Sequence, residues 1–222
     1  MKVLGFDPSM TNFGWALHDT AASGRGRCPD RGRFRTSSKT LFISRYVDLR
    51  GRVEALLDRT GAQYVGCEYP VFNDLWSEGM YGLFLYTCEA LWSKGVNLVV
   101  FSPGQIKAHA RLFLDRPKIN GKLWKMEKGD MVEAADKHTG GGARWNHNEA
   151  DAYWVARASG RFWEFMEGTL TQKDLTDIEA QQFTAVHTFV RGKKAGKTVH
   201  RGVAYREDER FFRWGDAPEE DS

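Results

Sequence analysis

Apolar residues follow strand-like and helix-like periods in turn along the first three quarters of the chain. Five short apolar runs predict β-strands, and the tight turn at Asp7-Pro8-Ser9 joins the first two into an antiparallel hairpin. After this hairpin, residues 20–37 are rich in Gly, Arg and Ser and predict an exposed loop. The predicted strands span residues 2–6, 12–18, 40–45, 63–68 and 97–101.

Helical spacing of apolar residues appears after the third strand and between the later ones. One helix is expected to open at Ser102-Pro103, since serine is a favoured cap and proline suits the first helical position. Tyr153, Trp154, Phe162 and Phe165 give the last long helix an apolar face. The other predicted helices span residues 47–59, 76–93, 129–137 and 147–166.

The order of these elements predicts an α/β fold with a mixed five-stranded sheet. Antiparallel strands lead, parallel strands follow, and helices cover both faces. Residues 1–168 would form this domain. Residues 169–222 are expected to form a C-terminal extension, in which the alternation over residues 198–214 predicts a β-hairpin.

Composition bounds the class of protein. The chain has 222 residues, 41% of them hydrophobic, which is enough for one domain with a real core. No apolar run approaches the roughly 18 residues that a membrane span needs, and residues 1–9 form a strand without a signal-peptide cleavage site. Three cysteines at no metal-like spacing fit a reducing compartment. We therefore expect a cytoplasmic protein with no membrane contact.

Positive charge is modest in total but clustered. The net charge of +3 permits nucleic-acid binding without requiring it. Basic clusters in glycine-containing segments are what a protein that binds phosphate backbones would present, although solvated surface loops give the same pattern. The clusters fall at residues 25–35, 118–128 and 191–201.

Three acidic residues occupy special positions. Asp7 closes the first strand, Glu68 closes the fourth, and Asp151 lies early in the last long helix. Neighbouring parallel strands end at one edge of a sheet, so Asp7 and Glu68 are expected side by side, with Asp151 brought in by a docking helix. Three gathered carboxylates repel one another unless a cation lies between them. Taken singly, Asp7 is better explained as a turn former, and Asp151 could be a helix-surface or first-turn acid.

Such a carboxylate cluster suits magnesium. This ion prefers oxygen ligands and keeps several waters, which leaves room for a phosphate. Two ions about 4 Å apart would activate a water molecule and stabilise the leaving oxygen in phosphodiester cleavage.

Five short motifs in order resemble the RuvC group of Holliday junction resolvases, within the RNase H-like nuclease superfamily. The first is Val3-Leu4-Gly5-Phe6-Asp7-Pro8-Ser9 together with the segment 11–17 that follows it, and Ser9 replaces the glycine usual in that group. Together the motifs cover roughly the first 167 residues. The remaining similar segments are 65–68 followed by Phe72, 101–107, 128–132 and 148–152.

This resemblance implies an RNase H-like fold and hydrolysis of DNA phosphodiesters. It also implies a homodimer that cuts four-way junctions or other branched DNA, with two Mg²⁺ ions per site and Mn²⁺ as the alternative ion. The extension-bearing form hints at a viral homologue, in which case the location would be the host cytoplasm.

One position departs from the resolvase pattern. The group usually carries a fourth acidic ligand three residues before its last aspartate, where this chain has Asn148. Our first choice for the fourth ligand is Asn148 through its carbonyl oxygen, and the second is His147 as ligand or general acid. Glu149 is a poor choice, because two residues before Asp151 it lies off that helical face.

Basic and aromatic residues near these motifs are candidates for DNA contact. Lys107 and Lys128 suit charge stabilisation near the scissile phosphate, and Lys118 and Lys122 suit further phosphate contacts. Phe72 and Trp76 follow Glu68 and could stack on unpaired bases. Solvated lysines and core aromatics are the alternatives.

Two other functions remain open at this stage. The same site would serve a nuclease acting on flaps, forks or RNA–DNA hybrids, because substrate choice depends on assembly geometry and loop shape. Alternatively, the chain could be a non-catalytic nucleic-acid-binding module. Asn148 favours that second alternative, whereas Asp7, Glu68 and Asp151 oppose it.

Overall fold

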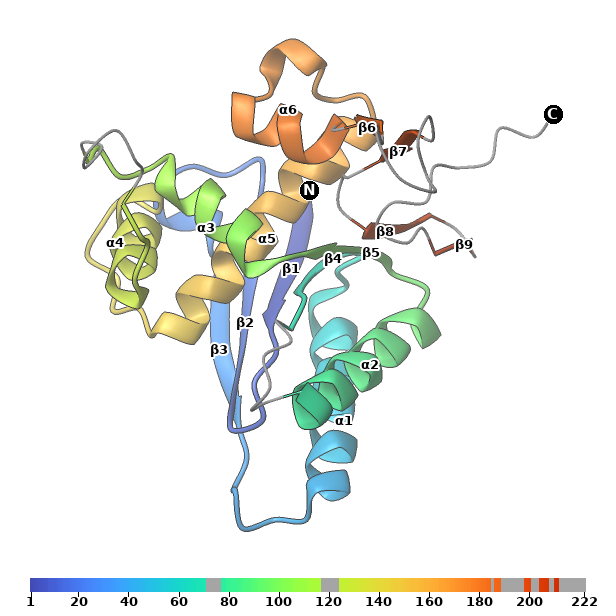
Figure 1. Ribbon diagram of the computed structural model, residues 1–222. Helices are drawn as coiled ribbons and strands as arrows, with labels where there is room; N and C mark the ends of the chain where they lie inside the picture. The colour runs from blue at the N-terminus through green and yellow to red at the C-terminus, as the bar shows by residue number, and fades with distance from the viewer. Residues whose placement is uncertain are drawn as a thin grey trace, which may run out of the picture.

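The computed structural model describes residues 1–70, 77–116 and 124–184, together with four short strands in the last part of the chain (Figure 1). These strands are β6 (Val186–Thr188), β7 (Thr198–His200), β8 (Ala204–Glu207) and β9 (Arg210–Phe211). Phe72, Trp76, Lys118 and Lys122 lie outside the described residues.

The first five strands form the expected mixed sheet. Its order is β3-β2-β1-β4-β5, with antiparallel pairing of β1 to β2 and of β2 to β3, and parallel pairing of β1 to β4 and of β4 to β5. The predicted five-stranded α/β arrangement is therefore confirmed. The strands are β1 (Lys2–Asp7), β2 (Asn12–Asp19), β3 (Asp30–Arg35), β4 (Tyr64–Glu68) and β5 (Asn97–Phe101).

Strands from the end of the chain extend this sheet to seven. β8 pairs antiparallel with the outer edge of β5, and β9 pairs antiparallel with β8. β6 and β7 pair separately as a two-stranded sheet. The edge of β5 is thus covered by a strand that lies more than 100 residues later in the sequence.

The prediction for the third strand was wrong. The strand lies at Asp30–Arg35, inside the expected loop, and residues 40–45 enter helix α1 (Phe42–Thr60). The sequence of β3 shows no alternation of apolar and polar residues, because arginines stand where apolar residues would be expected. Arg31 and Arg33 instead form ion pairs with Glu149 of a covering helix. The apolar run that predicted a strand at 40–45 instead begins a helix and remains largely exposed.

Helices cover both faces of the sheet, as expected (Figure 1). α1 and α2 (Ser77–Ser93) pack on one face against residues such as Phe6 and Val65. The opposite face carries α3 (Pro103–Arg111), α4 (Lys128–His138) and α5 (His147–Met166). The Ser102 cap predicted for α3 is present, with the serine hydroxyl accepting from the Gln105 amide at 3.3 Å.

α5 is the central helix of its layer. Its bounds match the sequence prediction, and Tyr153, Trp154 and Phe162 are buried beneath it. After α5 come a short 3₁₀ helix, η2 (Gln172–Asp174), and a short α-helix, α6 (Asp177–Thr184). Another 3₁₀ helix, η1 (Gly24–Arg27), precedes β3. Within the described ranges, no helix combines the length and hydropathy needed to cross a membrane.

Glycines let α5 lie directly on the sheet backbone. A Cβ atom on Gly5 of β1 would lie 2.1 Å from the Ala152 carbonyl oxygen, and one on Gly14 of β2 would lie 2.2 Å from the Asn148 carbonyl oxygen. A Cβ on Gly66 of β4 would lie 1.8 Å from Ser159 Oγ. Three adjacent strands therefore lack side chains where the helix crosses them, and this close approach fixes where the first turns of α5 lie.

We predict that Gly5→Ala destabilises the protein by about 3 kcal/mol, because the methyl group would collide with backbone atoms that cannot move independently of the helix. Chemical denaturation measures this change. The matched control is Gly51→Ala, in the middle of α1 with open space around the added Cβ. This control should stabilise by about 0.5–1 kcal/mol through helix propensity. Equal stabilities of the two variants would contradict the close-packing explanation.

Candidate active site

Asp7 and Glu68 lie side by side at one edge of the sheet. Asp7 ends β1, Glu68 ends β4, and the parallel register pairs Phe6 with Cys67, the residues just before the two acids. Both carboxylates therefore leave neighbouring strands at the same level. Sequence reasoning predicted this from the strand ends alone.

Asp151 reaches the same edge from α5. The next residue, Ala152, places its carbonyl against Gly5 of β1, two residues before Asp7. Asp151 is half-buried in the second turn of the helix. The glycine contact thus brings the third acid over the strand ends that carry the other two.

The three carboxylates act on one another electrostatically. Burial raises the pKa of Asp7 well above its ordinary value, and the charges of Glu68 and Asp151 raise it further. Burial and then Asp151 raise the pKa of Glu68 to about 8. Burial raises the pKa of Asp151 to about 6. These acids resist ionising together because they share a site with little water and no sufficient positive charge.

Two lysines partly offset this negative charge. Lys107 of α3 acts to lower the pKa of Glu68 and of Asp151. Lys128, the first residue of α4, acts to lower the pKa of Asp7 and of Asp151. Both side chains are exposed, so they border the acidic cluster on its solvent side. The two predicted lysines that fall in the described ranges therefore lie beside the carboxylates.

The donor set of this cluster fits a hard divalent cation. Carboxylate oxygens are the ligands that Mg²⁺ and Mn²⁺ prefer, and a cation would remove the repulsion that raises these pKa values. Among the residues that the structure describes, however, no three His, Cys, Asp or Glu side chains already converge tightly enough to coordinate one ion. The acids are neighbours with repelling charges, not a preformed cage.

The fourth-ligand candidates lie on the first turn of α5. Asn148 is buried above Gly14, the register partner of Asp7, and its side-chain amide donates to the Asn12 carbonyl. The amide oxygen is thus the atom left for a cation. Burial lowers the pKa of the half-buried His147, and Lys128 and Arg33 lower it further, so its imidazole is neutral at pH 7.

Glu149 points elsewhere, as its position on the helix predicted. It pairs with Arg31 at 3.4 Å and with Arg33 at 3.5 Å, and its carboxylate accepts from the Asn146 amide at the helix cap. Glu149 therefore fastens α5 to the edge strand β3.

The basic cluster at residues 25–35 is largely tied to the protein itself. Arg25 donates to the Gly141 carbonyl at 3.2 Å and Arg27 to the His138 carbonyl at 3.1 Å. Arg31 stacks over the Trp145 ring at 3.9 Å. These arginines are therefore better explained by structural contacts within the protein than by phosphate binding or by free solvation, the two explanations that the sequence left open.

Sequence reasoning missed a second polar cluster, on the other side of α5. Arg157, Glu179 and His109 are buried together, with Arg157 donating to Glu179 at 3.0 Å. A signal was present, because an arginine inside the apolar run of residues 152–160 needs a buried partner. Nothing in the sequence identified that partner, which lies 22 residues away.

The raised carboxyl pKa values predict an unusual pH dependence of stability. In the presence of a chelator, folded Glu68 and Asp151 hold protons that the unfolded chain, with pKa values of 4.5 and 3.8, has already lost. The folded state binds more protons between about pH 4 and pH 8, so the free energy of unfolding falls as the pH rises through this window.

Glu68→Gln should therefore be more stable than the wild type at pH 8, by about 1–3 kcal/mol, and the gap should close toward pH 5. Denaturation in EDTA at both pH values measures this. Glu164→Gln, on the same helix as Asp151 but outside the cluster, is the control. A pH-independent gap for Glu68→Gln would reject the electrostatic account.

Comparison with known proteins gives matches in structure only. No protein-family model matches the chain, and no curated protein matches it by sequence. Thermus thermophilus RuvC superposes with a TM-score of 0.57 at 20% identity, covering 70% of this chain and 91% of that one. T. thermophilus RuvC in complex with a Holliday junction substrate gives 0.55 at 19% identity, with 70% and 90% covered. The chain therefore has the RuvC-type, RNase H-like fold.

Proposed function

We propose that this protein is a divalent-metal-dependent endodeoxyribonuclease that resolves four-way junctions or other branched DNA by hydrolysing phosphodiesters. The observation that carries the proposal is the acidic cluster of Asp7, Glu68 and Asp151. These acids come from two strand ends and a helix. Burial raises the pKa of all three, and repulsion raises the pKa of Asp7 and of Glu68 further. A fold gains no stability from such a cluster, so its use is to bind positive charge.

Asp7, Glu68 and Asp151 would hold the cation, with the Asn148 amide oxygen as a fourth ligand. Mg²⁺ is the expected ion and Mn²⁺ the alternative, in a two-ion site. When bound, the ions would supply Lewis-acid activation of water and stabilisation of the leaving oxygen. The role of the protein is to present ionised oxygens in a fixed place.

Lys107 and Lys128 would attract the DNA phosphate to the carboxylates. Their positive charges already act on the acids, and both are exposed where a phosphate would arrive. A phosphate beside three carboxylates is repelled unless positive charge lies on its outer side. These lysines supply that charge and also help to keep the acids ionised.

His147 would act as a hydrogen-bond acceptor, not as a general acid. Its pKa is lowered by burial and by two neighbouring cations, so it is neutral near pH 7 and holds its proton weakly. A neutral imidazole beside the cluster can accept a hydrogen bond from a water molecule, or can serve as the alternative ligand to Asn148.

Branched DNA is the proposed substrate because the fold is that of RuvC, and one of the matched structures is RuvC in complex with a Holliday junction substrate. The site chemistry alone would serve any phosphodiester. Choice among junctions, flaps, forks and hybrids depends on assembly and loops.

We propose that two copies of the chain act together. Large apolar side chains gather in the first turns of α1, where Ile43 is 54% exposed and Val47 is 60% exposed. Leu85 on the neighbouring helix α2 is exposed as well. Clustered exposed apolar side chains mark association surfaces more often than isolated ones do, and a second copy is the partner that branched DNA with two equivalent strands requires.

We predict that Asp7→Asn abolishes cleavage of a synthetic four-way junction in Mg²⁺, by at least about 10³-fold, while junction binding remains measurable. Losing one of three carboxylates removes a ligand without changing side-chain volume. Gel assays with junction, flap, plain duplex and RNA–DNA hybrid, each in Mg²⁺ and in EDTA, measure cutting.

The matched control is Asp19→Asn, which ends β2 at the opposite end of the β1–β2 hairpin, beside Lys2. It should cut normally. Cutting by Asp7→Asn, or wild-type cutting in EDTA, would reject the site. If the wild type prefers flaps or hybrids, these replace branched junctions as the proposed substrate. If the wild type binds DNA but cuts none of the substrates, the protein is a non-catalytic binding module.

We predict that the wild type sediments as a dimer and that the double variant Ile43→Glu/Val47→Glu sediments as a monomer. Two buried charges at the centre of an apolar contact are not tolerated. Met166→Glu, at the exposed end of α5, is the control and should remain dimeric. Sedimentation velocity decides; a monomeric wild type or a dimeric double variant would contradict the dimer surface.

A further inference from the structure

A ring of buried and part-buried hydrogen bonds, closed through the α6 backbone between Glu179 and Gln182, joins α6, in the C-terminal segment, to α3 and α5. None of its members belongs to the proposed active site. The ring members are Gln105 and His109 of α3, Arg157 of α5, and Glu179 and Gln182 of α6.

Glu179 ties α6 to α5. Its carboxylate is fully buried and accepts from Arg157 at 3.0 Å, and from Arg161 through two nitrogens, each at 3.1 Å. The Thr176 amide donates to it as well, at 3.0 Å. Burial acts to raise the pKa of Glu179, but the bonds from Arg161 and the charge of Arg157 outweigh it and hold the pKa at about 2. The carboxylate therefore stays ionised and fully paired.

His109 carries the ring on to α3. The Arg157 guanidinium also lies 3.1 Å from His109 Nδ1, and a guanidinium can only donate, so Nδ1 accepts. The His109 proton is then on Nε2, which donates to Gln182 Oε1 at 2.9 Å. The Gln182 side-chain amide donates in turn to the main-chain carbonyl of Gln105 at 3.4 Å. This set of bonds requires the His109 tautomer that carries its proton on Nε2.

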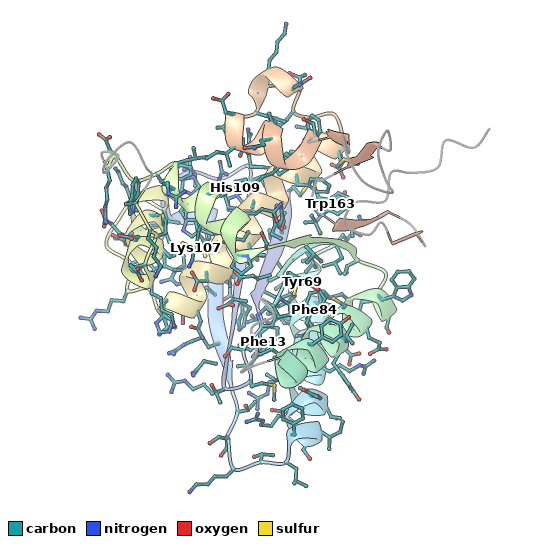
Figure 2. All side chains as sticks on the ribbon, viewed as in Figure 1. Phe13, Tyr69, Phe84, Lys107, His109 and Trp163 are labelled. Carbon is teal, nitrogen blue, oxygen red and sulfur yellow. The ribbon has the colours of Figure 1, made fainter. Side chains whose placement is uncertain are left out.

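The two helices held by this ring also carry two site residues. Lys107 lies on α3 between Gln105 and His109 (Figure 2), and Asp151 lies on α5 six residues before Arg157. Figure 1 shows α6 above the C-terminal part of α5. A shift of α3 along α5 would break the ring and move Lys107 relative to Asp151.

We propose that the C-terminal segment, through Glu179 and Gln182, positions Lys107 against the carboxylates of Glu68 and Asp151. Glu179 and Gln182 are thus positioning residues, and the proposal rests on the proposed nuclease function. A buried ionic ring stabilises a fold no better than apolar packing does, but it permits only one alignment of the elements that it joins. Alignment is what a lysine on α3 needs when the two acids it faces lie on a strand and on another helix.

The test uses Gln182→Leu in the full chain. This change preserves volume and leaves the Glu179–Arg157 pair intact, while it removes the link from α6 to His109 and Gln105. The protein should still fold, because one neutral hydrogen bond contributes only about 1 kcal/mol. Gln181→Leu, on the exposed side of the same helix, is the matched control.

The first readout is independent of activity. In protein free of metal and DNA, a carbodiimide converts a carboxylic acid to an O-acylisourea. The amine of a lysine within reach attacks its acyl carbon, which forms an amide and releases the urea, and peptide mass spectrometry detects the crosslink. We expect Lys107 to crosslink to Glu68 or Asp151 in the wild type and in Gln181→Leu, and severalfold less in Gln182→Leu. The second readout is junction cleavage, where we expect kcat to fall about tenfold, corresponding to about 1.4 kcal/mol, with KM nearly unchanged.

Unchanged crosslinking and unchanged kcat in Gln182→Leu would overturn the positioning role, and so would the absence of any Lys107 crosslink in the wild type. Loss of Tm alone, with normal crosslinking in the folded protein, would show a merely structural ring and also overturns it. If the wild type cuts no DNA, the proposed function fails, whereas the crosslinking comparison still decides the positioning role.

Discussion

The contact on which the structure depends is that of α5 with the bare backbone of three strands. At Gly5 and Gly14 the strand backbone meets the α5 backbone, and at Gly66 it makes room for the side chains of Ser159 and Val155. This close approach gives dense packing, and it prevents the small movements between helix and sheet that an intervening layer of side chains would allow. Asp151 is placed over the ends of β1 and β4 because the helix that carries it cannot slide.

That rigidity has a cost, which the rest of the fold offsets. Burial raises the pKa of the three acids held at one edge, and repulsion raises that of Asp7 and of Glu68 further, so the folded chain is strained there whenever they ionise. Hydrophobic layers on both faces of the sheet offset this repulsion, as do the ion pairs of Glu149 with β3. Stability is given up at the one place where the proposed chemistry needs charge.

The end of the chain strengthens the same framework from two sides. β8 covers the edge of β5, and α6 fastens α3 to α5 through buried polar contacts. The matched RuvC structures cover only 70% of this chain, so part of it has no counterpart in them. α6 contacts the helices that carry Lys107 and Asp151.

The sequence by itself determined the strands and helices whose periodicity is strong, including α5 to the residue, and the strand-end positions of Asp7 and Glu68, because local alternation and parallel pairing suffice for these. It could not place β3, whose arginines hide the alternation, nor the helical start of α1, whose apolar residues stay exposed. Only the tertiary structure brought Asp151 to the acids and Glu179 to Arg157. The contacts that do so join residues far apart in the chain, and a pattern that repeats every two or four residues carries no record of them.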